Sequence, residues 1–267
     1  MPTAGSITRS RQWCKTRAAS ACRIGALNFL GAARAVAALV AVAALGACHR
    51  GGAGDSPFPL AAGHRWTYDV TTRSDDGSIE RESLTLRTLG AESLAALGDQ
   101  TAWHRRSDSG IDYWLRADAT GIYRVASKSD LDPEPQLDRP ARFVLKAPYV
   151  VGTQWQTSTT AYLLMRRNEF PREIRHTHPS VPMAYAIEAV NESVQVKAGV
   201  FDRCLRVKGT ASVHIYADPA SGWRDMPLTT VEWYCAGVGL VKMERSEPAQ
   251  SAFLSGGART LELDSWE

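Results

Sequence analysis

The sequence predicts an all-β fold: a single antiparallel β-rich domain shaped as a curved sheet, a half-barrel or a sandwich. Three observations predict it. After residue 60, no long run of apolar residues recurs at the spacing of an α-helix. Short runs rich in Val, Thr, Trp, Tyr and Leu are separated by Gly, Pro, Asp and Ser, as in β-proteins. Of the 267 residues, 44% are hydrophobic and 22% are charged, a balance that supports a buried core.

The β-rich runs give the expected strands in chain order. They are 64–71, 79–89, 101–106, 111–117, 120–127, 140–146, 154–166, 183–196, 200–209, 211–217, 228–235, 238–245 and 257–263. Segments 107–110 and 117–121 place turn-forming residues between such runs, and both are predicted to be hairpin loops. Residues 91–97 form the one stretch that favours a short helix.

A short motif occurs twice, each time at the start of a β-rich stretch. Residues 59–66 and residues 148–155 share the form Pro-x-x-x-Gly-x-x-Trp. Physically, a proline stiffens the entry, a glycine turns the backbone and a tryptophan anchors the strand in the core. The repeat favours a pseudo-duplicated architecture, although three matching residues also arise by chance.

The first 47 residues have the features of an export signal. They hold six basic residues and no acidic ones, and residues 35–47 are an uncharged run of 13 apolar or small residues. A bilayer span needs about 20 such residues, so the run fits the apolar region of a signal peptide better than a membrane helix. We therefore expect 1–47 to be removed.

The apolar run ends in Leu-Gly-Ala-Cys at residues 45–48, which resembles a lipobox, the site at which lipoproteins are cleaved and lipidated. Cys48 is then the lipid-bearing residue and the anchor to the membrane. The alternative is an ordinary secreted protein in which Cys48 is incidental. In lipoproteins of enterobacterial type, Asp after this cysteine favours the inner membrane. His49 here implies an outer-membrane anchor with the domain facing the periplasm; the cell surface and the inner membrane are alternatives.

The rest of the chain divides into a tether and a domain. Residues 48–58 are rich in Gly, Ser and Pro and are predicted to form a flexible tether, followed by the β-rich domain at 59–267. The part after the leader has 25 basic and 28 acidic residues, so its net charge is about −3. Nucleic acid is not expected as a partner, since phosphate binding needs a basic surface.

Two cysteines remain in the domain once Cys14 and Cys22 leave with the leader and Cys48 is modified. Cys204 and Cys235 each lie in an expected strand, and the compartment permits disulfides. We expect them to bond to each other. Two buried free thiols are the alternative.

Both ends of the domain resemble a known group. Residues 58–68 are similar to the opening of a group of uncharacterised bacterial lipoproteins, in which a lipobox precedes Pro-Leu-x-x-Gly-x-x-Trp-x-Tyr. Segments 196–201, 204–207 and 234–242, the last containing Gly-Val-Gly-Leu-Val-Lys, resemble the closing strands of that group. The segment around 125–185 has no match. The resemblance implies an architecture and supplies no catalytic residues.

The sequence contains no convincing catalytic or metal-binding motif. Residues 107–110 read Ser-Asp-Ser-Gly, but no His or Asp partner motif accompanies them, so a turn is favoured. In a strand, His176 and His178 would share one face and could reach one metal ion, which makes them weak metal candidates. Pro171 and Pro179 bracket the pair and no third ligand is evident, so an exposed loop is favoured. The acidic stretch at 130–138 is interrupted by prolines, which favours a solvated linker over a calcium site. No enzyme and no cofactor is expected.

Two functions remain open. The first expectation is a non-enzymatic envelope module that binds a protein partner or has a structural role. The alternative is a carrier or chaperone for an apolar ligand, a lipid or a lipoprotein, which requires a cavity that side chains do not fill. The aromatic residues of the expected strands fit either a filled core or the walls of a groove.

Overall fold

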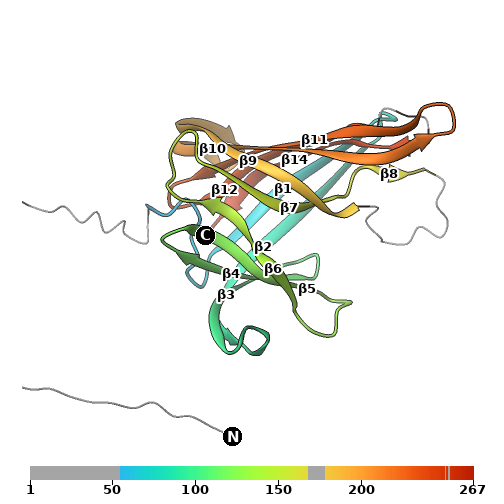
Figure 1. The fold of residues 1–267 in the computed structure, drawn as a ribbon. Helices are drawn as coiled ribbons and strands as arrows, with labels where there is room; N and C mark the ends of the chain where they lie inside the picture. The colour runs from blue at the N-terminus through green and yellow to red at the C-terminus, as the bar shows by residue number, and fades with distance from the viewer. Residues whose placement is uncertain (1–54, 168–177, 250, 252) are drawn as a thin grey trace, which may run out of the picture. The chain divides into compact units, whose positions relative to one another are not determined.

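The computed structural model describes residues 55–167, 178–249, 251 and 253–267, and its secondary structure there is almost entirely β-strand, as predicted (Figure 1). The strands are β1 (Arg65–Ser74), β2 (Ile79–Leu94), β3 (Gln100–Ser107), β4 (Ile111–Asp118), β5 (Gly121–Ser129), β6 (Gln136–Lys146), β7 (Gln154–Ala161), β8 (Met165–Arg166), β9 (His178–Val196), β10 (Gly199–Asp218), β11 (Gly222–Cys235), β12 (Gly239–Glu247), β13 (Leu254–Ser255) and β14 (Gly257–Trp266).

Twelve of the described strands form one antiparallel sheet in the order β6-β5-β4-β3-β2-β1-β14-β12-β11-β10-β9-β7. The short strands β8 and β13 pair separately. The pairing of β1 with β14 joins the two ends of the described chain. The two edge strands, β6 and β7, come close to each other, and the Arg142 guanidinium on β6 donates a hydrogen bond to the Ser158 carbonyl on β7. The sheet therefore curls until it is nearly closed.

The sheet consists of two six-stranded meanders that begin in the same way. The first runs from β1 to β6, and the second runs through β7, β9, β10, β11, β12 and β14. The repeated Pro-x-x-x-Gly-x-x-Trp motif opens each one. Gly63 (φ +93°) and Gly152 (φ +90°) both adopt the left-handed conformation that favours glycine. The Gly63 amide donates to the Thr88 carbonyl (3.0 Å), and the Gly152 amide donates to the Ile187 carbonyl (2.9 Å). The repeat in the sequence thus corresponds to a structural repeat.

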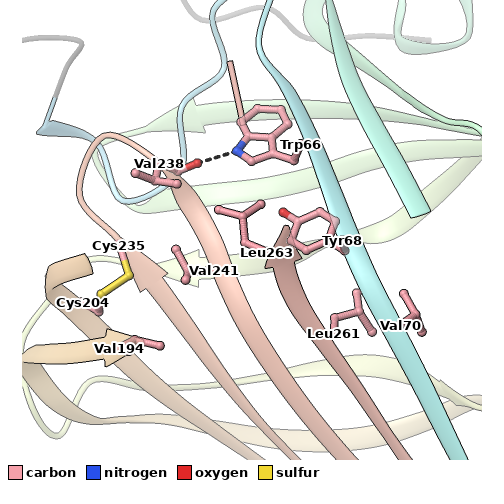
Figure 2. Close-up of a cluster of buried hydrophobic side chains, with 10 residues drawn as sticks. All are labelled: Trp66, Tyr68, Val70, Val194, Cys204, Cys235, Val238, Val241, Leu261 and Leu263. Atoms are coloured by element: carbon pink, nitrogen blue, oxygen red, sulfur yellow. Dashed lines mark hydrogen bonds between the residues drawn. A yellow bond between two sulfur atoms is a disulfide. The ribbon is translucent and has the colours of Figure 1, made fainter. Parts of the chain in front are cut away.

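Contacts between the beginning and the end of the domain build the core. The indole of Trp66 on β1 donates a 2.7 Å hydrogen bond to the Val238 carbonyl (Figure 2). The Tyr68 hydroxyl donates one of 2.9 Å to the Leu240 carbonyl. Both bonds join residues 172 positions apart. Buried polar atoms need such partners, so these bonds hold β1 against the β11–β12 loop at Val238 and against the start of β12 at Leu240.

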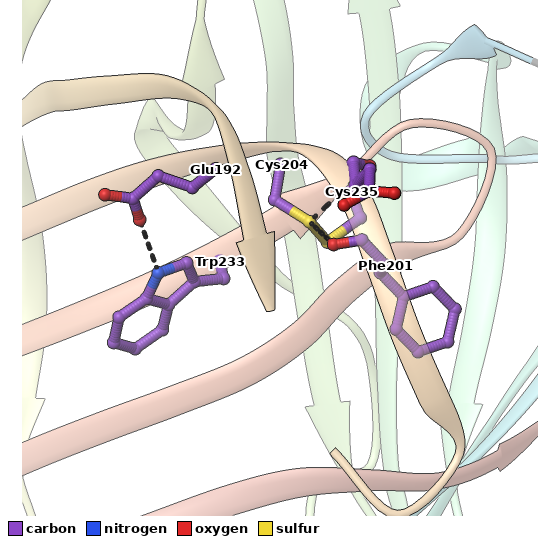
Figure 3. Close-up of a disulfide and its surroundings, with 6 residues drawn as sticks. Glu192, Phe201, Cys204, Trp233 and Cys235 are labelled. Atoms are coloured by element: carbon purple, nitrogen blue, oxygen red, sulfur yellow. Dashed lines mark hydrogen bonds between the residues drawn. A yellow bond between two sulfur atoms is a disulfide. The ribbon is translucent and has the colours of Figure 1, made fainter. Parts of the chain in front are cut away.

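Cys204 on β10 and Cys235 on β11 are joined by a disulfide, the pairing expected from the sequence (Figure 3). The two residues are direct partners across the β10–β11 ladder. Nearby, the Trp233 indole donates a 2.9 Å hydrogen bond to the Glu192 carboxylate on β9. The Cys204–Cys235 disulfide closes the base of the long β10–β11 hairpin beside the core.

Three local expectations differ from the structure. The helix expected at 91–97 is wrong for its first four residues, since β2 stays paired with β3 as far as Leu94 and only a 3₁₀ turn, Ala95–Leu97, follows. The break expected between 209 and 211 is absent, because Gly209 packs beneath neighbouring side chains and β10 continues through it. The strand expected at 154–166 ends at Ala161, after which the buried Glu247 carboxylate accepts hydrogen bonds from the amides of Leu163 and Leu164.

The described end of the predicted tether contacts the sheet. The Ser56 carbonyl accepts a 2.9 Å hydrogen bond from the Gly237 amide, and the Phe58 ring is buried close to the Tyr234 ring. Residues 55–58 therefore pack on the domain, and Phe58 reaches its interior.

Candidate ligand-binding site

A cavity of about 890 Å³ lies against the inner face of the curved sheet. Nine strands of the sheet contribute to it, together with Phe58. Its lining is Phe58, Tyr68, Glu82, Ser83, Leu84, Leu86, Arg105, Ser107, Asp108, Ser109, Ile111, Tyr113, Leu115, Arg124, Val144, Thr160, Tyr162, Leu240, Met243, Arg259 and Leu261. Sites for small apolar molecules have this size and this mainly apolar, partly aromatic character.

The apolar side chains around the cavity leave it unfilled. Leu84, Leu86, Ile111, Leu240 and Met243 all line it, yet each keeps part of its surface accessible. In a filled interior, apolar side chains pack at the density of organic crystals and leave few voids larger than a water molecule. A cavity of this volume would hold about 30 waters at the density of the liquid, an unfavourable filling for leucine walls.

One rim of the cavity is polar. Glu82, Ser83, Asp108 and Ser109 line it from β2 and the β3–β4 turn, and all four are exposed. The Glu82 carboxylate pairs with the Arg259 guanidinium across the β2–β1–β14 surface. The cavity therefore opens toward solvent beside this turn, and its deeper walls are apolar.

Arg105 is the charged side chain deepest in the wall. It lies on β3, is 7% exposed and lines the cavity. Its Nη2 donates a 2.8 Å hydrogen bond to the Pro59 carbonyl, and its Nε lies 3.3 Å from the Thr88 hydroxyl. Burial lowers the pKa of Arg105 to about 10, so the guanidinium stays charged at neutral pH.

Three tyrosines give the cavity neutral polar groups. Burial raises the pKa of Tyr68 and of Tyr113, and it raises the pKa of Tyr162 to about 12. A phenol in such surroundings stays protonated at neutral pH and can donate a hydrogen bond. Tyr113 and Tyr162 thus add hydrogen-bonding capacity without adding charge, whereas the Tyr68 hydroxyl already donates to the Leu240 carbonyl.

A half-buried carboxylate, that of Glu232, is not part of the cavity lining. Glu232 on β11 accepts hydrogen bonds from the hydroxyls of Tyr234 (2.5 Å) and Thr230 (3.2 Å). Burial raises its pKa despite these bonds and despite the charge of Arg245. The arrangement offers no nucleophile and no substrate-facing acid–base pair.

Of the residues singled out in the sequence, only Cys204 and Cys235 are brought together within the described part of the chain. Cys48 and His176 lie outside the described residues, and His178 begins β9. Ser107–Gly110 forms the expected turn, closed by a hydrogen bond from the Gly110 amide to the Ser107 carbonyl. In the described part of the chain, no group of three His, Cys, Asp or Glu side chains is arranged to hold a metal ion.

The acidic stretch at 130–138 is occupied by contacts within the protein. Asp132 accepts hydrogen bonds from the amide and hydroxyl of Ser129, and Asp138 forms a two-bond ion pair with Arg124 at 2.6 and 2.8 Å. These carboxylates therefore stabilise the β5–β6 hairpin.

Sequence reasoning missed Arg105. It stands between His104 and Arg106, and strand alternation can place either Arg105 or its two neighbours on the inner face. Only the register of β3 against β2 and β4 shows that the middle residue points inward.

In the described residues, no helix has the length and hydropathy needed to cross a membrane. No protein-family model matches the chain, and no curated protein matches it in sequence.

Two solved structures show a distant likeness. One is a candidate lipoprotein from Parabacteroides distasonis ATCC 8503, at 14% identity and a TM-score of 0.35, covering 80% of this chain and 99% of the other. The second is a candidate exported protein with a YmcC-like fold from Bacteroides fragilis NCTC 9343, at 14% identity and a TM-score of 0.34, covering 79% and 98%. TM-scores this low establish neither a shared fold nor a shared function.

Proposed function

We propose that the domain binds an apolar or amphiphilic molecule in its interior cavity and acts as a carrier or chaperone for it in the cell envelope. The observation that supports this proposal is the unfilled cavity of about 890 Å³ with mainly apolar walls. The sequence led us to expect a protein-binding or structural module first, with the carrier as the alternative. A structural module has no need of such a cavity, so the cavity favours the carrier.

The uptake of an apolar probe by the purified mature chain tests this function. N-phenyl-1-naphthylamine fluoresces when it leaves water, so we expect its emission to rise with saturation in the presence of the protein. The Leu86→Trp variant places a larger side chain in the cavity and is expected to reduce the bound fraction strongly. Leu89→Trp is the matched control, because Leu89 is on the same strand but 54% exposed.

Two results would contradict the proposal. One is a wild-type chain that takes up no probe; the other is a folded Leu86→Trp variant that binds as well as Leu89→Trp does. Ile111→Phe narrows the cavity from a different strand, β4, and gives an independent variant should Leu86→Trp not fold.

We also propose that lipid on Cys48 anchors the chain to the outer membrane with the domain in the periplasm. The leader and the lipobox-like segment at 45–48 support this. Cells fed an alkyne analogue of palmitate should label the wild type and a Cys22→Ser control, and should not label Cys48→Ser. Equal labelling of Cys48→Ser would refute lipidation at this residue.

A further inference from the structure

The Arg105 guanidinium lies between two aromatic rings at the wall of the cavity. Its central carbon is 4.3 Å from the centre of the Trp66 ring and 4.4 Å from that of Phe58. The hydrogen bonds to Pro59 and Thr88 hold it in place. A guanidinium has five N–H donors, and these protein contacts use two of them. The group is therefore held rigidly with donors to spare.

Arg105 has no counter-ion among the described residues. The other arginines that line the cavity do: Arg124 pairs with Asp138, and Arg259 pairs with Glu82. The equally buried Arg245 pairs with Glu247 at 2.6 Å. The ionisable groups that interact with Arg105 are the hydroxyls of Tyr68 and Tyr234. Burial raises the pKa of both hydroxyls, so neither carries a negative charge at neutral pH. Buried charges are normally paired, because removing a lone ion from water costs several kcal/mol.

We infer that Arg105 binds the anionic head group of a single-chain amphiphile whose hydrocarbon chain lies along the apolar wall of the cavity. This inference deepens the proposed function and rests on it. A carboxylate or a phosphate fits the donor geometry, since a guanidinium binds two oxygens of either group side by side. Such a head group supplies the missing counter-charge, and Leu84, Leu86 and Ile111 offer the chain an apolar surface.

The polar rim limits where the head group can go. Asp108 is a carboxylate at the open side of the cavity and repels an anion there, and Arg259 is already paired with Glu82. The deep position of Arg105 is the favourable one for a negative charge. The ligand accordingly enters with its charged end toward Arg105 and leaves its chain against the leucines.

Paired ligands that differ only in the head group test the inference on the wild-type chain. Oleate and oleyl alcohol have the same chain, and 1-oleoyl lysophosphatidate distinguishes a phosphate from a carboxylate. We expect oleate or the lysophosphatidate, measured by displacement of N-phenyl-1-naphthylamine at about pH 8, to bind about 10- to 100-fold more tightly than oleyl alcohol, as a charge-assisted pair implies.

Variants at position 105 test whether Arg105 causes the preference for anionic ligands. Arg105→Met should remove the preference for the anionic ligands over oleyl alcohol. Arg105→Lys keeps the charge but not the planar fork and should retain part of the preference. Arg87→Met is the control, because Arg87 is exposed on β2 next to the inward-facing Leu86.

The outcomes separate the two proposals. If oleyl alcohol binds and the anionic ligands bind no better, the head-group inference is wrong and the carrier function stands. If none of the three binds, the carrier function itself fails. An anionic preference that survives in a folded Arg105→Met variant also overturns the role of Arg105. Should Arg105→Met not fold, the wild-type comparison and Arg105→Lys still decide the question.

Discussion

Trp66 and Trp155 occupy equivalent positions in the two halves of the sheet, but only the Trp66 indole has a hydrogen-bond partner. Each residue comes three positions after the turning glycine and is the second residue of a strand that pairs with the next long strand of its half. Trp66 donates to the Val238 carbonyl at 2.7 Å. The Trp155 Nε1 is buried without a partner among the described residues, and its ring stacks on Tyr185 at 5.5 Å.

The same substitution should therefore have unequal effects at the two positions. Trp66→Phe loses a buried hydrogen bond and leaves the Val238 carbonyl unpaired, whereas Trp155→Phe removes a donor that is already unpaired. We expect Trp66→Phe to lower the free energy of unfolding by about 1–3 kcal/mol more than Trp155→Phe does. Urea denaturation of both variants measures this difference. Equal losses would show that the hydrogen bond adds nothing to stability.

Loss of the disulfide should destabilise the domain substantially. Cys204 and Cys235 are 31 residues apart. In the chain-entropy model, a disulfide that closes a loop of this size restricts the unfolded chain and so stabilises the folded state by about 4 kcal/mol. We expect the Cys204→Ala/Cys235→Ala double variant to lose about this much in urea denaturation. Wild type unfolded with a reducing agent should show a similar loss.

Glu232 should make stability depend on pH. Burial raises its pKa above the ordinary value of 4.5, so the folded state holds the proton at pH values where the unfolded state has lost it. Below about pH 4.5, Glu232 is protonated in both states and its contribution to the free energy of unfolding does not change with pH. As pH rises from 4.5 through the raised pKa of the folded state, the unfolded state alone loses the proton, and the free energy of unfolding falls.

Glu232→Gln removes this titration. Denaturation from about pH 4 to about pH 8 should show the variant gaining stability relative to the wild type as pH rises. Glu134→Gln is the control, since Glu134 is exposed, and it should show no such trend. A difference between Glu232→Gln and wild type that is constant across this range would contradict the assignment.

A side chain at Gly209 should disturb the packing at the centre of β10. A Cβ atom there would lie 2.7 Å from Tyr185 Cε1, 2.7 Å from Thr230 Cγ2 and 2.8 Å from Met183 Cε. We expect Gly209→Ala to lower the free energy of unfolding by about 1–3 kcal/mol, the usual cost of overpacking. Thr210→Ser, at the exposed next position, should change it by less than about 0.5 kcal/mol. Thermal denaturation of the two variants makes the comparison.

The strands were predictable because their signals are local. Alternating β-rich runs, the turn residues at 107–110 and 117–121, and the repeated glycine–tryptophan motif each act within a few positions. Where a local signal misled, a contact from another strand was the reason. Pairing with β3 keeps β2 extended through Leu94, and packing by Tyr185 and Thr230 lets β10 pass straight through Gly209.

By itself, the sequence determined the all-β class, the positions of most strands, and the two cysteines of the domain that can form a disulfide. The tertiary structure decided the closure of the sheet, its cavity and the inward direction of Arg105. The union of the two halves depends on β1 meeting β14 and on bonds such as that from Trp66 to Val238, which join residues 172 positions apart, and closure depends on β6 meeting β7. A cavity depends on how far opposite walls stand from each other, and no local pattern encodes that distance. A one-residue change in register would turn Arg105 outward, so its role follows from strand pairing alone.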